Sequence, residues 1–284
     1  MEAGPSDGDL YERQQRLIAN YHRKRSRGQH DAAKAMLKKS VFELLAERQL
    51  IPAVNLIKLM LQSMREDGDA TNEEAVAAMD TIWKLFGSKV QNDAEAALLT
   101  GLVNDFCRLL QQQLGEDDAQ ELIIAEHRLL ATLLSKAVPE RLGVYLPFAV
   151  SGFKPASSFL PVIERTFPSS SEAPVDERQL AMTRVLLAYA AAWAPAPAAL
   201  AQLRESVAEY KAAVQGSPAP LIQFVDMFVQ ALEARKVEQA RQLIQFYRKL
   251  LEYDDQILKS AKKGVDAIAG SGGFSPLAAL LRGR

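Results

Sequence analysis

Apolar residues recur at intervals of three and four along most of the chain, which is the spacing of one face of an α-helix. The run Val54, Ile57, Leu61 and Met64 shows it clearly. Alternating valine, isoleucine and threonine runs flanked by turn residues, the pattern of strands, are nearly absent, and only 15 of 284 residues are glycine. The sequence therefore predicts an all-α protein.

Short breaks containing glycine, proline or helix-capping residues divide this pattern into paired helices. Helices joined in pairs by tight turns are typical of an α-solenoid, while a globin-like or bundle arrangement stays open because no exact repeat has a fixed period. We predict helices over residues 8–27, 30–48, 52–66, 72–87, 91–114, 117–136, 139–150, 156–166, 176–194, 197–214, 219–233 and 237–264.

Two segments near opposite ends of the chain follow one plan. Ala33 is followed by Leu37 and Phe42, and Ala240 by Leu243 and Phe246. A small alanine near the start of the second helix of a tetratricopeptide-like hairpin lets two helices approach closely. Both segments are therefore predicted to be helical hairpins of this type.

The segment 151–174 contains four prolines and divides the helical pattern. Phe153, Phe159 and Ile163 are too apolar for a free linker, so we predict a short packed helix followed by a mobile tail at 168–175. The predicted organisation is an N-terminal solenoid half over residues 1–150, a C-terminal half over 151–270 and a flexible tail rich in glycine and leucine over 271–284.

Residues 21–40 carry seven lysines and arginines against one acid. The whole chain nevertheless has a net charge of −1, and a lone basic turn supports only salt-sensitive, sequence-blind contact with nucleic acid. Solvated cations at a helix C-terminus are the simplest interpretation. A nuclear address and an acidic protein partner are the alternatives, and we expect no nucleic-acid partner.

Residues with catalytic or metal-binding chemistry are scattered. His22, His30 and His127 form no spaced set with carboxylates, and the glycines of 270–275 lack the strand and lysine of a phosphate loop. We therefore expect no enzyme activity, cofactor or metal. The single cysteine, Cys107, is predicted to be a buried helical residue and suits a reducing compartment.

Long apolar segments are also missing from the sequence. No run of 18 apolar residues occurs, and the acidic N-terminus lacks the order of a signal peptide. The expected location is the cytosol, without direct membrane insertion.

Several stretches resemble one known family. The N-terminal match lies in Leu10–Leu61 and includes Tyr11, Glu12 and Gln15, and later matches are EHRLLATLL, YLPFAVSG, AMTRVLLAYA and residues 220–251. In this order and spacing the chain resembles the Golgi-to-ER traffic protein four family, the adaptor of the tail-anchored-protein targeting pathway.

The resemblance implies a right-handed α-solenoid without an active site. Its N-terminal half would dock the targeting ATPase, and its C-terminal half would hold a ubiquitin-like subunit or a BAG-domain scaffold protein, giving a hetero-oligomer. Such an adaptor promotes hand-over of tail-anchored proteins for insertion into the ER by binding several partners at once.

The residues that match the family's first helix are predicted to face the ATPase: Tyr11, Gln15, Arg16, Arg23 and Lys24. The family's histidine is replaced by Gln14, and acids of its third helix by Asn55 and Gln62. The acidic run 66–74 could take over this role or be a solvated loop.

The C-terminal half departs from some family members, because the loop before residue 219 is too short for an inserted β-hairpin. Phe224, Met227 and Phe228 are the nearest apolar residues and are the predicted contacts for the ubiquitin-like partner. Core packing is the alternative role for them. A generic tetratricopeptide-like or proteasome-lid-like scaffold, and an RNA-binding helical repeat, are the competing functions.

Overall fold

The structure, a computed structural model, describes residues 7–167, 175–214 and 219–270. Helices account for the regular structure of these residues, and no strand occurs among them, so the predicted all-α class is confirmed. The chain divides into two compact units, unit 1 up to Val138 and unit 2 from Pro139. The predicted flexible tail 271–284 lies outside the described residues, and so do residues 168–174 of the mobile tail predicted over 168–175. Val175, the last residue of that predicted tail, is buried instead.

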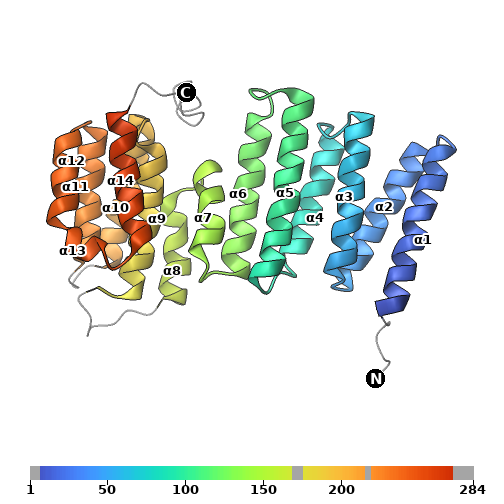
Figure 1. Ribbon diagram of the computed structural model, residues 1–284, viewed down its shortest axis with the longest axis horizontal. Helices are drawn as coiled ribbons and strands as arrows, with labels where there is room; N and C mark the ends of the chain where they lie inside the picture. The colour runs from blue at the N-terminus through green and yellow to red at the C-terminus, as the bar shows by residue number, and fades with distance from the viewer. Residues whose placement is uncertain (1–6, 168–174, 215–218, 271–284) are drawn as a thin grey trace. The chain divides into compact units, whose positions relative to one another are not determined.

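The described residues of unit 1 form six helices that run alternately up and down as stacked hairpins (Figure 1). Its helices pack mainly on their neighbours in sequence and on the next helix but one, which is the arrangement of an α-solenoid. Their bounds are α1 Asp7–Ser26, α2 His30–Ala46, α3 Leu50–Asp67, α4 Glu73–Gly87, α5 Asp93–Leu114 and α6 Gln120–Ala137.

Unit 2 is built around α9, which packs against α7, α10, α11 and α14. Because α7 packs on α9, residues 139–150 fall in unit 2, whereas the sequence placed the division at 150/151. The bounds are α7 Leu142–Ser151, the 3-10 turn η1 Ala156–Phe159, α8 Leu160–Thr166, α9 Glu177–Trp193, α10 Pro197–Ala213, α11 Pro220–Glu233, α12 Val237–Phe246, α13 Arg248–Leu251 and α14 Asp255–Ala269.

Five turns share one construction, although only two of them contain the glycine that sequence analysis relies on. In each, one residue has φ between 51° and 73°, and the N–H of the next residue donates to the carbonyl five residues earlier. This hydrogen bond satisfies a carbonyl at the end of the first helix. The five left-handed residues are Gly28, Arg48, Gly68, Phe153 and Arg235.

The predicted alanine plan is confirmed at both ends of the chain. Ala33 and Ala240 are fully buried, and each N–H donates to the carbonyl of the residue that precedes its helix. Ala53 repeats the same arrangement at the start of α3, which sequence analysis did not recognise because Pro52 suggested a later helix start. Proline is tolerated in the first turn of a helix, so α3 begins at Leu50 instead.

The last predicted helix, 237–264, is wrong as a single element. The chain turns at Tyr247 between α12 and α13, and Asp254 caps a new helix by accepting hydrogen bonds from the backbone N–H groups of Gln256 and Ile257. Cys107 is buried as predicted, and burial, together with the nearby Glu126, raises the pKa of its thiol to about 12.

Replacing Ala33 with leucine is expected to lower the free energy of unfolding by about 1–3 kcal/mol, because added methylenes overfill a site with no exposed surface. Chemical denaturation of the full chain measures the change. Ala32 is exposed beside it, so Ala32→Leu is the matched control and should have little effect. Equal midpoints for the two variants would contradict close packing at this turn.

Candidate functional site

The ends of α1, α2 and α3 are joined by an ion-pair network. Arg25 on α1 pairs with Asp67 at 2.9 Å, and Lys34 on α2 pairs with the same carboxylate at 2.8 Å. Arg25 also donates hydrogen bonds to Ser63 Oγ at 2.7 Å and to the hydroxyl of the buried Tyr21 at 3.1 Å. Part of the basic run and part of the acidic run therefore neutralise each other within unit 1.

The network changes the acidity of its members. Burial by itself would raise the pKa of Asp67, but Lys34 and Arg25 outweigh burial, and the pKa of this carboxyl lies below its usual value. Burial opposes the charged form of Lys34 in the same way, and Asp67 and Asp69 reverse this effect and raise its pKa. Asp67, Lys34 and Arg25 are thus all charged in the folded state near neutral pH. The acidic run 66–74 is not simply a solvated loop, since Asp67 and Asp69 are paired.

The cations that remain at the end of α1 are Arg23, Lys24 and Arg27. Arg23 and Arg27 are exposed, Lys24 is half-buried, and none of the three forms an ion pair among the described residues. These side chains are free to meet an acidic surface, and Arg25, which sequence analysis counted with them, is not.

The five predicted ATPase contacts on α1 do not form one compact patch. Tyr11 and Gln15 are exposed and lie four residues apart on one face. Arg16 and Arg23 lie seven residues apart on another face, and Arg16 pairs with Glu12 at 2.9 Å. Lys24 follows Arg23 near the end of the helix. Any partner that contacts all five must wrap around α1.

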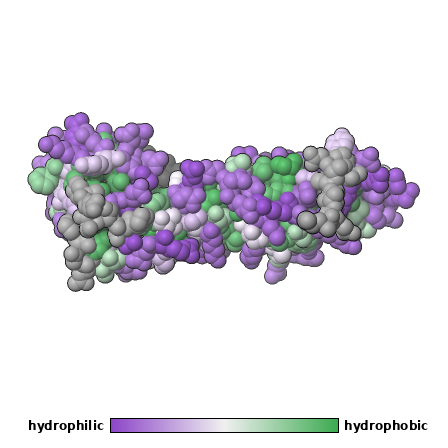
Figure 2. Space-filling model, turned by 90° about the horizontal axis from the view of Figure 1, so that it is seen from below, coloured by the Kyte–Doolittle hydropathy of each residue, from purple (hydrophilic) through white to green (hydrophobic). Residues whose placement is uncertain are grey.

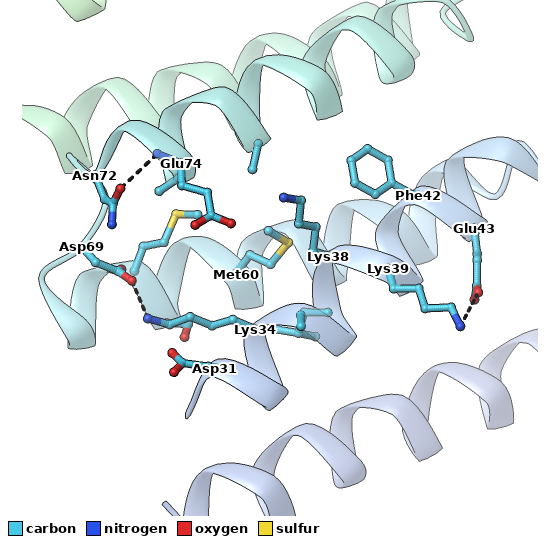
Figure 3. A pocket seen from close by; sticks show the side chains of 16 residues that line it. Asp31, Lys34, Lys38, Lys39, Phe42, Glu43, Met60, Asp69, Asn72 and Glu74 are labelled. Atoms are coloured by element: carbon cyan, nitrogen blue, oxygen red, sulfur yellow. Dashed lines mark hydrogen bonds and ion pairs between the residues drawn. The ribbon is translucent and has the colours of Figure 1, made fainter. Parts of the chain in front are cut away.

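A groove of about 830 Å³ lies between α2 and α4, with α3 contributing to its lining. Lys34, Lys38 and Phe42 line it from α2 at successive intervals of four residues, so they share one face of that helix. Figure 3 shows Lys38 and Phe42 across the groove from Glu74 at the start of α4, with Met60 between them. Sequence analysis missed this groove, although the spacing of the three α2 residues was visible.

The groove carries opposite charges on its two sides. Lys34 is neutralised by Asp67 and Asp69, and Lys39 lies 3.8 Å from Glu43. Lys38 and the carboxylate of Glu74 have no ion-pair partner within the described ranges. This arrangement suits the docking of an amphipathic segment.

Two of the three predicted contacts in unit 2 are core residues. Phe224 and Phe228 have no exposed surface, and their rings stack at 5.2 Å because they lie one turn apart on the inner face of α11. They cannot touch a partner directly, and this part of the prediction is corrected. Met227, 37% exposed, points outward. Among the described residues of unit 2, the exposed aromatic side chains of Phe246 and Tyr253 were missed.

The surface is mainly polar, because most of the large apolar side chains are buried between packed helices. Most of the face in Figure 2 is hydrophilic, with hydrophobic residues gathered at a patch of unit 1. In the part of the chain that the structure describes, no helix combines the length and apolarity that crossing a bilayer requires.

The described residues form an all-α protein of stacked helical hairpins, which is the α-solenoid class of fold. Neither a family model nor a curated protein sequence matches the chain. Among solved structures, the chain is similar to the crystal structure of Get4 from C. therm., with 16% identity, a TM-score of 0.63, and coverage of 99% of this chain and 90% of that one. The fold is therefore Get4-like, as the sequence resemblance implied.

Proposed function

We propose that this chain is a non-enzymatic adaptor in the targeting of tail-anchored membrane proteins. The observation that carries the proposal is the Get4-like fold, which extends over 99% of the chain. Likeness across nearly the whole length fits an adaptor better than a module grafted onto another protein, because each of several partners needs its own surface.

The first partner in this proposal is the targeting ATPase, bound by unit 1. Arg23, Lys24 and Arg27 offer unpaired positive charge at the end of α1, and complementary charge increases the rate of association and fixes orientation. The groove between α2 and α4 offers an apolar anchor in the same unit. The expected partner surface is acidic, with an apolar segment beside the acids.

The second partner is a ubiquitin-like subunit or a BAG-domain scaffold protein, bound by unit 2. Binding both partners in one chain raises their effective concentration toward each other, which is how an adaptor promotes hand-over of a client without chemistry. Met227 is the only one of the three predicted contacts in this unit that is available at the surface.

Reversing Arg16 and Arg23 to glutamate is expected to weaken binding of the purified targeting ATPase by at least about tenfold, because rim charges then repel an acidic surface. Titration calorimetry with an ATP analogue present measures the affinity. Circular dichroism should be unchanged, since both side chains are exposed. Lys262→Glu, on an exposed position of unit 2, is the control.

Two results would favour the competing functions. If the wild-type chain does not bind the ATPase in the presence of an ATP analogue, the adaptor proposal fails. The alternative is then a helical scaffold for an unrelated protein partner. If the chain instead binds RNA, with an affinity that falls steeply with salt and disappears when Arg23, Lys24 and Arg27 become alanine, the helical-repeat alternative is correct.

A further inference from the structure

Ser26 is the last residue of α1 and directly follows three basic residues, Arg23, Lys24 and Arg25. Of all the serines and threonines in the sequence, it alone has an arginine three positions earlier. Serine kinases with an acidic substrate groove select such serines, because carboxylates of the groove pair with basic side chains two and three residues before the hydroxyl that receives phosphate. The sequence around Ser26 therefore fits this class of enzyme.

The structure leaves the hydroxyl of Ser26 accessible. Ser26 is exposed, and its Oγ donates a hydrogen bond to the carbonyl of Arg23 at 3.0 Å. The backbone turns two residues later at the left-handed Gly28. Because the last turn of a helix opens at lower cost than its middle, this end of α1 can enter a kinase groove.

The basic residues before Ser26 are divided in a way that suits recognition by a kinase. Arg23 and Lys24, at the two positions that an acidic groove contacts, form no ion pair among the described residues. Arg25, directly before the serine, is held by Asp67 at 2.9 Å and Glu66 at 3.3 Å. The side chain that is tied to unit 1 is thus the one that this mode of recognition does not require.

Two other serines separate the contributions of sequence and exposure. Ser40 follows two lysines, but it is only 5% exposed. Ser88, just after the end of α4, is exposed like Ser26, and its Oγ donates to the carbonyl of Leu85, also three residues earlier, at 2.7 Å. Ser88 therefore has the geometry of Ser26 without an arginine at the position that the kinase reads.

We propose that Ser26 is a phosphorylation site for a serine kinase with an acidic substrate groove, and that the phosphate closes the positively charged surface at the end of α1 to acidic partners. In the transfer, Ser26 Oγ attacks the γ-phosphorus of a nucleoside triphosphate held by the kinase. The new Oγ–P bond replaces the bond from the γ-phosphorus to the oxygen that bridges it to the β-phosphorus. The nucleoside diphosphate leaves, and the hydroxyl proton passes to a carboxylate of the kinase.

The phosphate changes the charge of the surface that the proposed function assigns to the ATPase. A phosphoserine adds about 1.5–2 negative charges at neutral pH, which cancels about half or more of the charge of the three cations without ion pairs among the described residues, Arg23, Lys24 and Arg27. Arg23 lies one turn before Ser26 on the same side of α1, and Arg27 follows it. Their positive charge offsets the unfavourable placement of an anion at a helix C-terminus, so α1 stays folded.

The test incubates the full chain with the catalytic subunit of cAMP-dependent protein kinase, ATP and Mg²⁺, and mass spectrometry measures and locates the phosphate. We expect one phosphoryl group at Ser26, none at that position in Ser26→Ala, and incorporation at least about tenfold slower in Arg23→Ala. Ser88→Ala is the matched control and should be phosphorylated at Ser26 like the wild-type chain.

A second measurement follows the charge of the surface with a fluorescent peptide of glutamate residues at low salt. We expect the phosphorylated chain to bind this acidic probe at least about fivefold more weakly than the unmodified chain, with no change for kinase-treated Ser26→Ala. Fluorescence anisotropy gives both affinities.

The inference would be overturned if Ser26 received no phosphate, if Arg23→Ala were phosphorylated as fast as the wild-type chain, or if phosphate left the affinity for the acidic probe unchanged. The effect of the phosphate on ATPase docking rests on the proposed adaptor function. Neither measurement contains the ATPase, so failure of this inference is distinguishable from failure of the proposed binding between unit 1 and the ATPase.

Discussion

Replacing Glu126 with glutamine is expected to raise the free energy of unfolding of unit 1 by about 2–4 kcal/mol at pH 9 and to change it little near pH 4. Glu126 on α6 is 2% exposed, and its Oε2 has no hydrogen-bond partner among the described residues. Burial, followed by the neighbouring Asp80 carboxylate on α4, raises the pKa of Glu126 from 4.5 to about 8. Trp83 and Lys84 oppose this only in part.

The direction follows from proton binding. Above pH 4.5 the unfolded chain releases the proton of Glu126, whereas the folded chain keeps it until about pH 8. Raising the pH across this interval therefore favours the unfolded state, and above pH 8 the full cost of a buried carboxylate is present. Glutamine keeps the shape and cannot ionise, so the contribution of Glu126 to the pH dependence of stability should disappear in the variant.

Urea unfolding at pH 4, 7 and 9, followed by the fluorescence of Trp83 in a Trp193→Phe background, measures this difference within unit 1. Both tryptophans are buried, so each reports on its own unit. Glu116→Gln, at an exposed position between α5 and α6, is the control and should leave the pH dependence intact. A parallel pH profile for Glu126→Gln and the wild-type chain would show that Glu126 is not the responsible group.

Replacing Arg25 with methionine is expected to lower the free energy of unfolding by about 2–4 kcal/mol, because it removes one partner of a largely buried ion network. The Arg25 side chain is 17% exposed and Asp67 18%. Its loss leaves Ser63 Oγ without its donor and Asp67 with Lys34 as its remaining close cation.

The comparison that isolates this effect is Arg27→Met. Arg27 lies two residues further along, is exposed and forms no ion pair within the described part of the chain, so its replacement should change stability little. Urea unfolding at neutral pH with the Trp83 signal measures both variants. Equal stabilities would mean that the Arg25 network contributes no more than a solvated surface pair.

Much of the fold was predictable because its determinants are local. Helical spacing, most glycine and proline breaks and the buried alanines at Ala33 and Ala240 all act within a few residues, and they were found in the structure. Pro52 is an exception, because it lies inside the first turn of α3. The errors lie where a local signal was missing or ambiguous. Arg48 turns the chain without a glycine, and Asp254 caps a new helix inside a continuous apolar pattern.

The candidate site was less predictable, because exposure depends on packing between segments that are distant in sequence. Arg25 and Arg23 have the same chemistry, and only the position of Asp67, 42 residues after Arg25, decides which of them is free. Phe228 and Phe246 are equally apolar, and only the packing of α11 places one inside and the other at the surface.

The turns that use a left-handed residue other than glycine have a consequence for how hairpins are spaced. The left-handed backbone conformation is unfavourable for residues with a side chain. Phe153 and Arg48 nevertheless adopt it. The ring of Phe153 stacks on that of Trp193 with centres 6.0 Å apart, and Arg48 pairs with Glu95 at 3.3 Å. Glycine would relax the backbone and lose the contact. A turn that carries a side chain can therefore act as a spacer that fixes the register of a neighbouring helix as well as reversing the chain.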